Sequence, residues 1–142
     1  MRTALLLSLL AAGCTPRTPA DVADRFVDLY FVEIDQKRAL AYTSGLAHGR
    51  LEEELGLVEK VRQEMTPDLK KPSVFYVRRD LQVDGVRARA TYDITVRQGR
   101  DETLRSALVS LEEEGGRWTV GNFIVREGHL TARPPAAPPK SP

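Results

Sequence analysis

The 142-residue chain contains a single cysteine, Cys14, and only two histidines, His48 and His129. One cysteine excludes an intramolecular disulfide, so the hydrophobic core has to stabilise any folded domain. Neither an HxxxH nor a CxxC motif occurs in the sequence, so no recognisable set of zinc ligands is present. GxGxxG, GxxxxGK and a nucleophile-elbow serine are absent as well. The sequence therefore predicts no metal, no cofactor and no catalytic site of these kinds.

The chain also lacks a strong net charge and a long apolar run. Its 21 basic and 20 acidic side chains give a net charge of +1. Nucleic-acid binding usually requires a strongly basic face, so we expect no nucleic-acid partner. The apolar run from Ala4 to Ala12, broken by Ser8, is nine residues long. This is too short for a helix to cross a hydrocarbon core of about 30 Å.

The N-terminal residues are instead typical of an export signal. Arg2 gives a basic start, the apolar run follows, and the small residues Ala11, Ala12 and Gly13 precede Cys14. "LAAGC" resembles the lipobox of bacterial lipoproteins, although the usual leucine three places before the cysteine is Ala11 here. The resemblance implies that residues 1–13 are a signal peptide, and that the sulfur of Cys14 receives a diacylglycerol. Residues 14–18 would then form a lipidated tether.

The alternative is ordinary secretion, which would leave a free thiol on the exported chain. In lipoproteins of this kind an aspartate after the cysteine retains the protein in the inner membrane. Thr15 is not an aspartate. The resemblance therefore implies a location at the periplasmic face of the outer membrane, if the source has two membranes.

The chain ends in a segment with little to bury. Residues 130–142 contain five prolines, which is typical of an extended, partly polyproline segment. We expect a disordered tail over residues 128–142 that acts as a spacer. A docking ligand for a proline-binding domain is the alternative. The remaining residues, 19–127, suffice for one domain.

The first half of this domain has helical periodicity. Thr18, Pro19 and Asp21 form a helix-start signal with a capping box. A bend is expected near Ile34, with Asp35 capping a second short helix over residues 36–43 that Ser44 and Gly45 end. A third amphipathic helix is predicted up to Pro67, with the apolar positions Leu51, Leu55, Val58, Val61 and Met65 on one face.

The second half alternates between apolar and polar residues. Residues 86–96 keep this alternation for a whole strand with one buried face. Asp84-Gly85 and Gly115-Gly116 are expected hairpin turns. Strands over residues 74–83, 86–96, 104–113 and 117–126 would form a four-stranded antiparallel meander. The apolar parity slips in the last two strands, which predicts bulges, with Gly121 as one site.

Helices followed by long curved hairpins resemble the NTF2-like (cystatin-like cone) superfamily, and "ADRFVDLYFVEIDQKRALAYTSG" resembles its small lipoproteins. The resemblance covers residues 19–127 and implies an α+β fold with N-terminal helices packed on a curved sheet. A general α+β sandwich is the alternative. The superfamily includes isomerases, dehydratases, polyketide cyclases and non-catalytic binding modules, so the fold does not settle the function. Pairing of two copies through their sheets is also implied by resemblance only.

Two groups of side chains are candidates for binding. Four aromatic side chains are candidates to line a pocket, although ordinary core packing is the favoured explanation: Tyr30, Tyr42, Tyr92 and Trp118. Arg87 and Arg89 are candidates for an anion- or partner-binding face. They belong to a set from neighbouring strands and turns: Arg78, Arg79, Arg87, Arg89, Arg97, Arg100 and Arg105. Interleaved acids favour cross-strand ion pairs on this face over a basic stripe.

These observations leave three hypotheses for the function. The first is a non-enzymatic, lipid-anchored envelope protein that binds a partner or a small ligand. The second is a SnoaL-type isomerase or cyclase with Tyr30, Tyr42, Tyr92, Asp35 or His48 in its pocket. It requires a deep cavity with a buried ionisable group that lacks a structural partner. The third is a structural component of an envelope complex, which a large exposed apolar patch on the sheet would favour.

Overall fold

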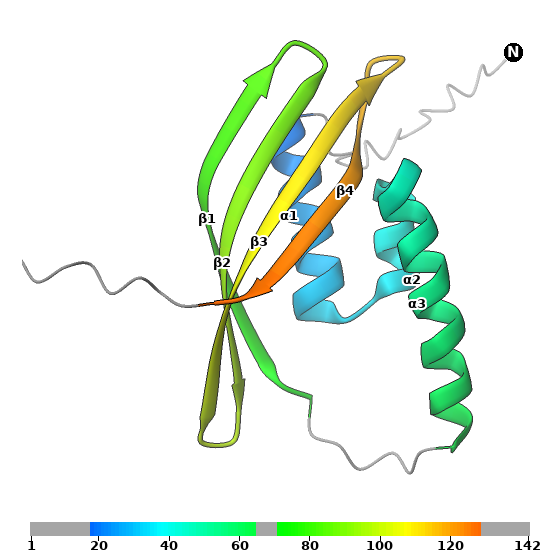
Figure 1. The fold of residues 1–142 in the computed structure, drawn as a ribbon, viewed down its shortest axis with the longest axis vertical. Coiled ribbons are helices and arrows are strands. Elements are labelled where there is room, and N and C mark those ends of the chain that lie inside the picture. Colours follow the sequence, from blue (N-terminus) through cyan, green and yellow to red (C-terminus); the bar gives the residue numbers. More distant parts are fainter. Residues whose placement is uncertain (1–17, 65–70, 129–142) are drawn as a thin grey trace, which may run out of the picture.

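The helices come first in the chain and cover one face of the sheet that follows (Figure 1). The computed structural model describes residues 18–64 and 71–128. The helical elements are α1 (Pro19–Val27), the π-helical turn η1 (Asp28–Glu33), α2 (Gln36–Ala39), the 3-10 turn η2 (Leu40–Tyr42) and α3 (Gly45–Glu64). The strands are β1 (Ser73–Asp84), β2 (Arg87–Gln98), β3 (Asp101–Glu114) and β4 (Arg117–Glu127). They form one antiparallel sheet in the order β1-β2-β3-β4. The predicted α+β class and four-stranded meander are thereby confirmed.

The start of α1 is fixed by the expected capping box. The Asp21 amide donates to the Thr18 hydroxyl oxygen at 3.1 Å, and the Thr18 amide donates to the Asp21 carboxylate at 3.3 Å. Together they satisfy two amides that a helix N-terminus would otherwise leave unpaired. Val22 and Phe26, four residues apart, are both buried against the sheet.

The bend after the first helix is also where the sequence predicts it. Ile34 has a left-handed backbone with φ of 55°, which is rare for a β-branched residue. Asp35 then caps α2, because its carboxylate accepts from the Arg38 amide at 3.0 Å. The second helix is shorter than expected, since its last turn winds into the 3-10 turn η2.

The start of the third helix differs from the prediction. Ser44 and Gly45 do end the second helical segment, because η2 stops at Tyr42 and Ser44 is not helical. α3 begins directly afterwards with Gly45, so His48 lies in the first turn of this helix instead of in a loop. The reason is packing: Ala47 and Leu51 are four residues apart and both are buried, so they extend the apolar face towards the N-terminus.

The second half of α3 buries less than predicted. Leu55 and Val58 are half-buried, whereas Val61 is 48% exposed. Figure 1 shows the cause, because the second half of α3 passes the end of β4, the strand that α3 packs against. The burial of Val61 was therefore predicted wrongly. Met65 and Pro67 lie outside the described residues.

The sheet keeps the predicted alternation in β2, where Ala88, Ala90, Tyr92 and Ile94 are buried. We call the face that carries them, beneath the helices, the inner face, and the opposite side the outer face. The first hairpin turn is Gly85-Val86, one residue later than expected, with Gly85 at φ of 57°. Each of the three hairpins pairs its strands over most of their length.

One of the two predicted bulges is confirmed. Ser110 pairs with Asn122 and Leu111 with Val120, so Gly121 is the extra residue of β4. The parity change in β3 has another cause, because Leu104 and Leu108 lie on the outer face opposite Val109 and Leu111. Apolar residues on both faces of β3 give the same change of parity as a bulge would. The predicted bulge in β3 was therefore wrong.

The core fills the space between the helices and the inner face. Phe26 and Phe123 are fully buried with ring centroids 5.1 Å apart, and Tyr92, Leu29 and Leu51 are buried around them. At the free edge of β4, the Ser44 amide donates to the Val120 carbonyl at 2.9 Å, which ties the start of α3 to the sheet. Within the described ranges, no helix combines the length and the apolar character that a membrane span requires.

Candidate binding cleft

Two of the four candidate pocket aromatics belong to the core. Tyr92 is fully buried, and its hydroxyl donates to one Asp24 carboxylate oxygen at 2.7 Å. Arg78 donates to the other Asp24 oxygen at 2.8 Å. Burial, together with the hydrogen bond to Asp24, raises the pKa of Tyr92 far above its ordinary value. Trp118 is buried near the β3–β4 turn. The ordinary core interpretation therefore holds for Tyr92 and Trp118.

A cleft of about 350 Å³ opens between the helices and the inner face. Tyr30 and Phe31 of η1 form one wall of it. Val74, Val96 and Val125 line it from three strands of the sheet. We call it the helix–sheet cleft. Its volume lies at the lower end of the range of small-molecule sites.

Tyr30 is the one predicted pocket aromatic that lines this cleft. Its hydroxyl donates to the Glu54 carboxylate at 2.7 Å, and its ring meets Phe31 edge-on with centroids 4.7 Å apart. Burial, followed by the hydrogen bond to Glu54, raises the pKa of Tyr30 above its ordinary value. Tyr30 is therefore a fixed hydrogen-bond donor with little tendency to ionise.

Two arginines face the helix–sheet cleft from opposite layers. Arg50 of α3 donates to the Glu54 carboxylate and to the Phe123 carbonyl, both at 3.3 Å, and lies 4.6 Å above the Phe123 ring centroid. Arg105 belongs to the inner face of β3, paired with Ile94 on β2 and Glu127 on β4. Among the cleft-lining residues that the structure describes, these two are cationic and none is acidic.

Arg105 is incompletely paired. Its Nη2 atom lies 3.6 Å from the Glu127 carboxylate, which is 83% exposed. Its Nε atom is buried without a hydrogen-bond partner, the only side-chain nitrogen or oxygen in this situation among residues 18–61 and 71–128. Buried donors are nearly always satisfied in folded proteins, so such an exception marks a candidate site.

Neither cleft arginine was predicted from the sequence to line a pocket. Arg105 was grouped with the other strand arginines, although it has the same parity as Ala107, Val109 and Leu111, which are all buried. That parity was the signal that places it on the inner face. Arg50 had no comparable signal, because it lies before Leu51, the first apolar position assigned to the third helix.

The remaining candidate residues are not brought together. Tyr42 is half-buried on η2 and does not line the helix–sheet cleft. Asp35 is occupied as the cap of α2. His48 contacts the Thr43 hydroxyl through Nδ1 at 3.1 Å and Glu52 through Nε2 at 3.5 Å. No group of three or more His, Cys, Asp or Glu side chains that would suit a metal ion occurs in the described part of the chain. His129 and Cys14 lie outside it.

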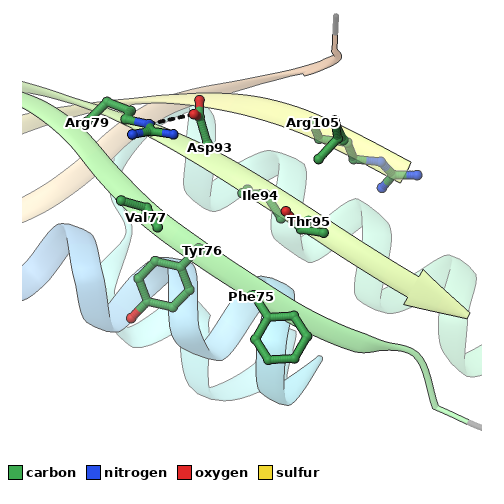
Figure 2. A pocket seen from close by; sticks show the side chains of 9 residues that line it. Phe75, Tyr76, Val77, Arg79, Asp93, Ile94, Thr95 and Arg105 are labelled. Atoms are coloured by element: carbon green, nitrogen blue, oxygen red, sulfur yellow. Dashed lines mark hydrogen bonds and ion pairs between the residues drawn. The ribbon is translucent and has the colours of Figure 1, made fainter. Parts of the chain in front are cut away.

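The outer face holds the expected ion pairs. Arg79 of β1 donates to Asp93 of β2 at 2.5 Å, as Figure 2 shows, and Arg97 donates to Glu102 at 2.6 Å. Arg78 instead turns to α1 and binds Asp24. These pairs leave little net charge on the face. Arg87 and Arg89 are exposed and make no ion pair within the described ranges, and their role in anion or partner binding stays a prediction.

The outer face also carries exposed apolar side chains. Phe75 and Val77 on β1 are 54% and 55% exposed, and Ile124 on β4 is 43% exposed. A hollow of about 130 Å³ runs beside Phe75 and Val77 (Figure 2), and one of about 230 Å³ lies next to Ile124. We call these three residues the outer apolar row.

Comparison with protein-family models, with curated proteins and with solved structures finds no match to this chain.

The raised pKa values of Tyr30 and Tyr92 predict a loss of stability in alkali. Unfolded tyrosine ionises near pH 10, whereas Tyr30 and Tyr92 resist ionisation in the folded protein. Their contribution to stability is complete below about pH 10 and is lost as the pH rises further, because the unfolded chain then releases protons that the folded chain retains. Absorbance of tyrosinate should rise together with the loss of circular dichroism. Complete ionisation near pH 10 in a folded chain would contradict this.

Proposed function

We propose that this chain is a lipid-anchored protein of the bacterial cell envelope, and that its NTF2-like domain binds a small ligand in the helix–sheet cleft without catalysing a reaction. The order of elements supports the NTF2-like proposal, since helices precede an antiparallel meander with long strands. The small residues before the lone Cys14 support the anchor. A location at the periplasmic face of the outer membrane is part of the proposal.

The tether in this proposal is short. Only Thr15, Pro16 and Arg17 separate Cys14 from Thr18, the cap of α1. Four extended steps of chain span at most about 14 Å. An acylated Cys14 would therefore hold the domain directly at the membrane surface.

The observation that carries the binding part is the composition of the cleft: apolar walls with Arg50 and Arg105 and no acidic side chain among the described lining residues. Proton abstraction requires a base that is free to act. The Glu54 carboxylate contacts two cleft-lining residues and accepts from both of them, Tyr30 and Arg50. Asp24 is likewise held by Tyr92 and Arg78. This geometry favours binding over the isomerase or cyclase alternative.

Filling the cleft tests the binding part. Val74→Trp places a large side chain into the cleft, whereas Val77→Trp on the same strand adds it to the exposed outer face. Native mass spectrometry of the full chain, extracted mildly from membranes, should show an adduct of small mass on the wild type and on Val77→Trp. The adduct should be absent from Val74→Trp. A wild-type protein without any adduct, or an adduct that Val74→Trp retains, would contradict the proposal.

The outer apolar row favours a second candidate function, attachment to an envelope protein or to another copy of the chain. Contiguous exposed apolar patches are typical of interaction sites, and Phe75 and Val77 lie together on the outer face of β1. Val77→Glu should then convert a sedimenting complex to the monomer without unfolding it, with Val83→Glu, also exposed on β1, as the control. A wild type that sediments as a monomer at all concentrations would remove the self-association form of this candidate.

A further inference from the structure

The helix–sheet cleft places two guanidinium groups against apolar walls. Arg105 approaches from β3 and Arg50 from α3, while Val74, Val96 and Val125 supply apolar surface between the strands. A cation on the inner face of a sheet is unusual, because inner-face positions normally hold apolar side chains. The neighbouring inner position of β3, Ala107, follows that rule and is buried.

The two arginines differ in how well they are paired. Arg50 already donates to Glu54 and to the Phe123 carbonyl. Among the residues that the structure describes, Arg105 has only the exposed Glu127 carboxylate, 3.6 Å from Nη2, and its buried Nε–H has no acceptor. A guanidinium offers five N–H donors in a planar fork that matches the two oxygens of a carboxylate or phosphate. Arg105 therefore keeps most of its capacity to bind an anion.

We propose that the ligand of this cleft is an amphiphile with one anionic headgroup, a carboxylate or a phosphate, on a short apolar chain. The proposal rests on the binding function proposed above and names the class of ligand. The headgroup binds Arg105, with a small rotation of the side chain that turns the Nε–H towards the ligand oxygen, and Arg50 adds a second positive charge. The chain lies on Val74, Val96 and Val125.

The size of the cleft limits the ligand. Its volume of about 350 Å³ corresponds to roughly a dozen water-sized groups, at about 30 Å³ for each. A straight chain of about ten carbon atoms fits this volume. Decanoate, decyl phosphate and decanol are therefore matched probes, since they share the apolar chain and differ in the headgroup.

Isothermal titration calorimetry of the full chain carrying Cys14→Ser, in detergent-free buffer, tests the proposal. Decanoate or decyl phosphate should bind at least about tenfold more tightly than decanol, as expected for a charge-assisted hydrogen bond. The tighter of the two anions identifies the headgroup. Arg105→Gln should remove this tenfold advantage and leave decanol binding within about twofold. Arg126→Gln, the same change at an exposed outer-face position of β4, should leave all three affinities unchanged.

Folding of the variants is checked by thermal melting. If Arg105→Gln melts early, Arg50→Gln gives a second, independent loss of anion affinity.

Equal binding of decanol and both anions would overturn the proposed ligand class while the binding function stands. An equal loss in Arg126→Gln and Arg105→Gln would overturn the role of Arg105. Failure of all three probes to bind, with an adduct still present on the protein extracted from membranes, would overturn the ligand class alone. Failure of the probes together with absence of that adduct would overturn the binding function as well.

Discussion

Cys14→Ser is expected to move the protein almost completely from the membrane fraction to the soluble fraction of fractionated cells. Each buried methylene contributes about 0.8 kcal/mol to membrane binding, so two or more acyl chains anchor a protein stably where one chain gives only reversible binding. Serine keeps the size and polarity of the side chain but offers no sulfur to acylate. No other segment of the described chain provides a membrane-spanning helix.

The matched control for this experiment is Thr15→Ser, one residue further along, which leaves the cysteine in place. It should remain in the membrane fraction. The proposed anchor would be wrong if Cys14→Ser sedimented with membranes to the same extent as the wild type, after a high-salt wash that removes proteins bound through surface charge.

The second large effect is expected at the centre of the core. Phe123→Ala should lower the free energy of unfolding by about 3–5 kcal/mol, the usual cost of deleting a buried phenylalanine ring. Phe123 is 1% exposed, and its ring lies 5.1 Å from Phe26 and 5.0 Å from Tyr30, measured between centroids. The ring also supports Arg50, so its removal should weaken ligand binding in the helix–sheet cleft.

Urea unfolding followed by circular dichroism measures this effect. Phe75→Ala is the control, because Phe75 is 54% exposed on the outer face and its loss should cost no more than about 0.5 kcal/mol. Since a domain of this size is stable by only about 5–15 kcal/mol, Phe123→Ala should be close to unfolding at 37 °C. Equal destabilisation by the two substitutions would contradict the placement of the core.

The features that the sequence predicted well are those that local residues determine. The Thr18–Asp21 capping box, the cap at Asp35 and the turn at Gly115-Gly116 each depend on a few neighbouring atoms. The alternation over β2 and the extra residue at Gly121 also follow from neighbours along the chain. For this reason the α+β class and the strand order were predictable.

The failures arose where tertiary contacts outweighed local signals. The face of Ala47 and Leu51 starts α3 directly after the stop at Ser44 and Gly45, so His48 is helical. Val61 lies in the half of α3 that passes the end of β4 and is 48% exposed, and periodicity alone could not show this. A bulge at Arg79 in β1 went unpredicted, because apolar residues on both faces of that strand hide the change of parity.

The candidate site was predictable only in part. Tyr30 was a pocket candidate and does line the helix–sheet cleft, but Tyr92 and Trp118 are core residues. That Arg105 lies in a cleft opposite η1 and α3 depends on how the helices pack on the inner face, and only the assembled fold shows this. The parity of Arg105 with Val109 indicates its face, and the missing acceptor of its Nε is visible only in the structure.

The central claim is that Cys14 carries the lipid that holds this domain at an envelope membrane. Intact mass spectrometry of the mature polypeptide, extracted from membranes, tests it most directly. We predict a chain that begins at residue 14 and carries the added mass of a diacylglycerol on its first residue, with or without a further acyl chain on the amine. A mature chain with an unmodified thiol at Cys14, or one that still retains residues 1–13, would contradict the account.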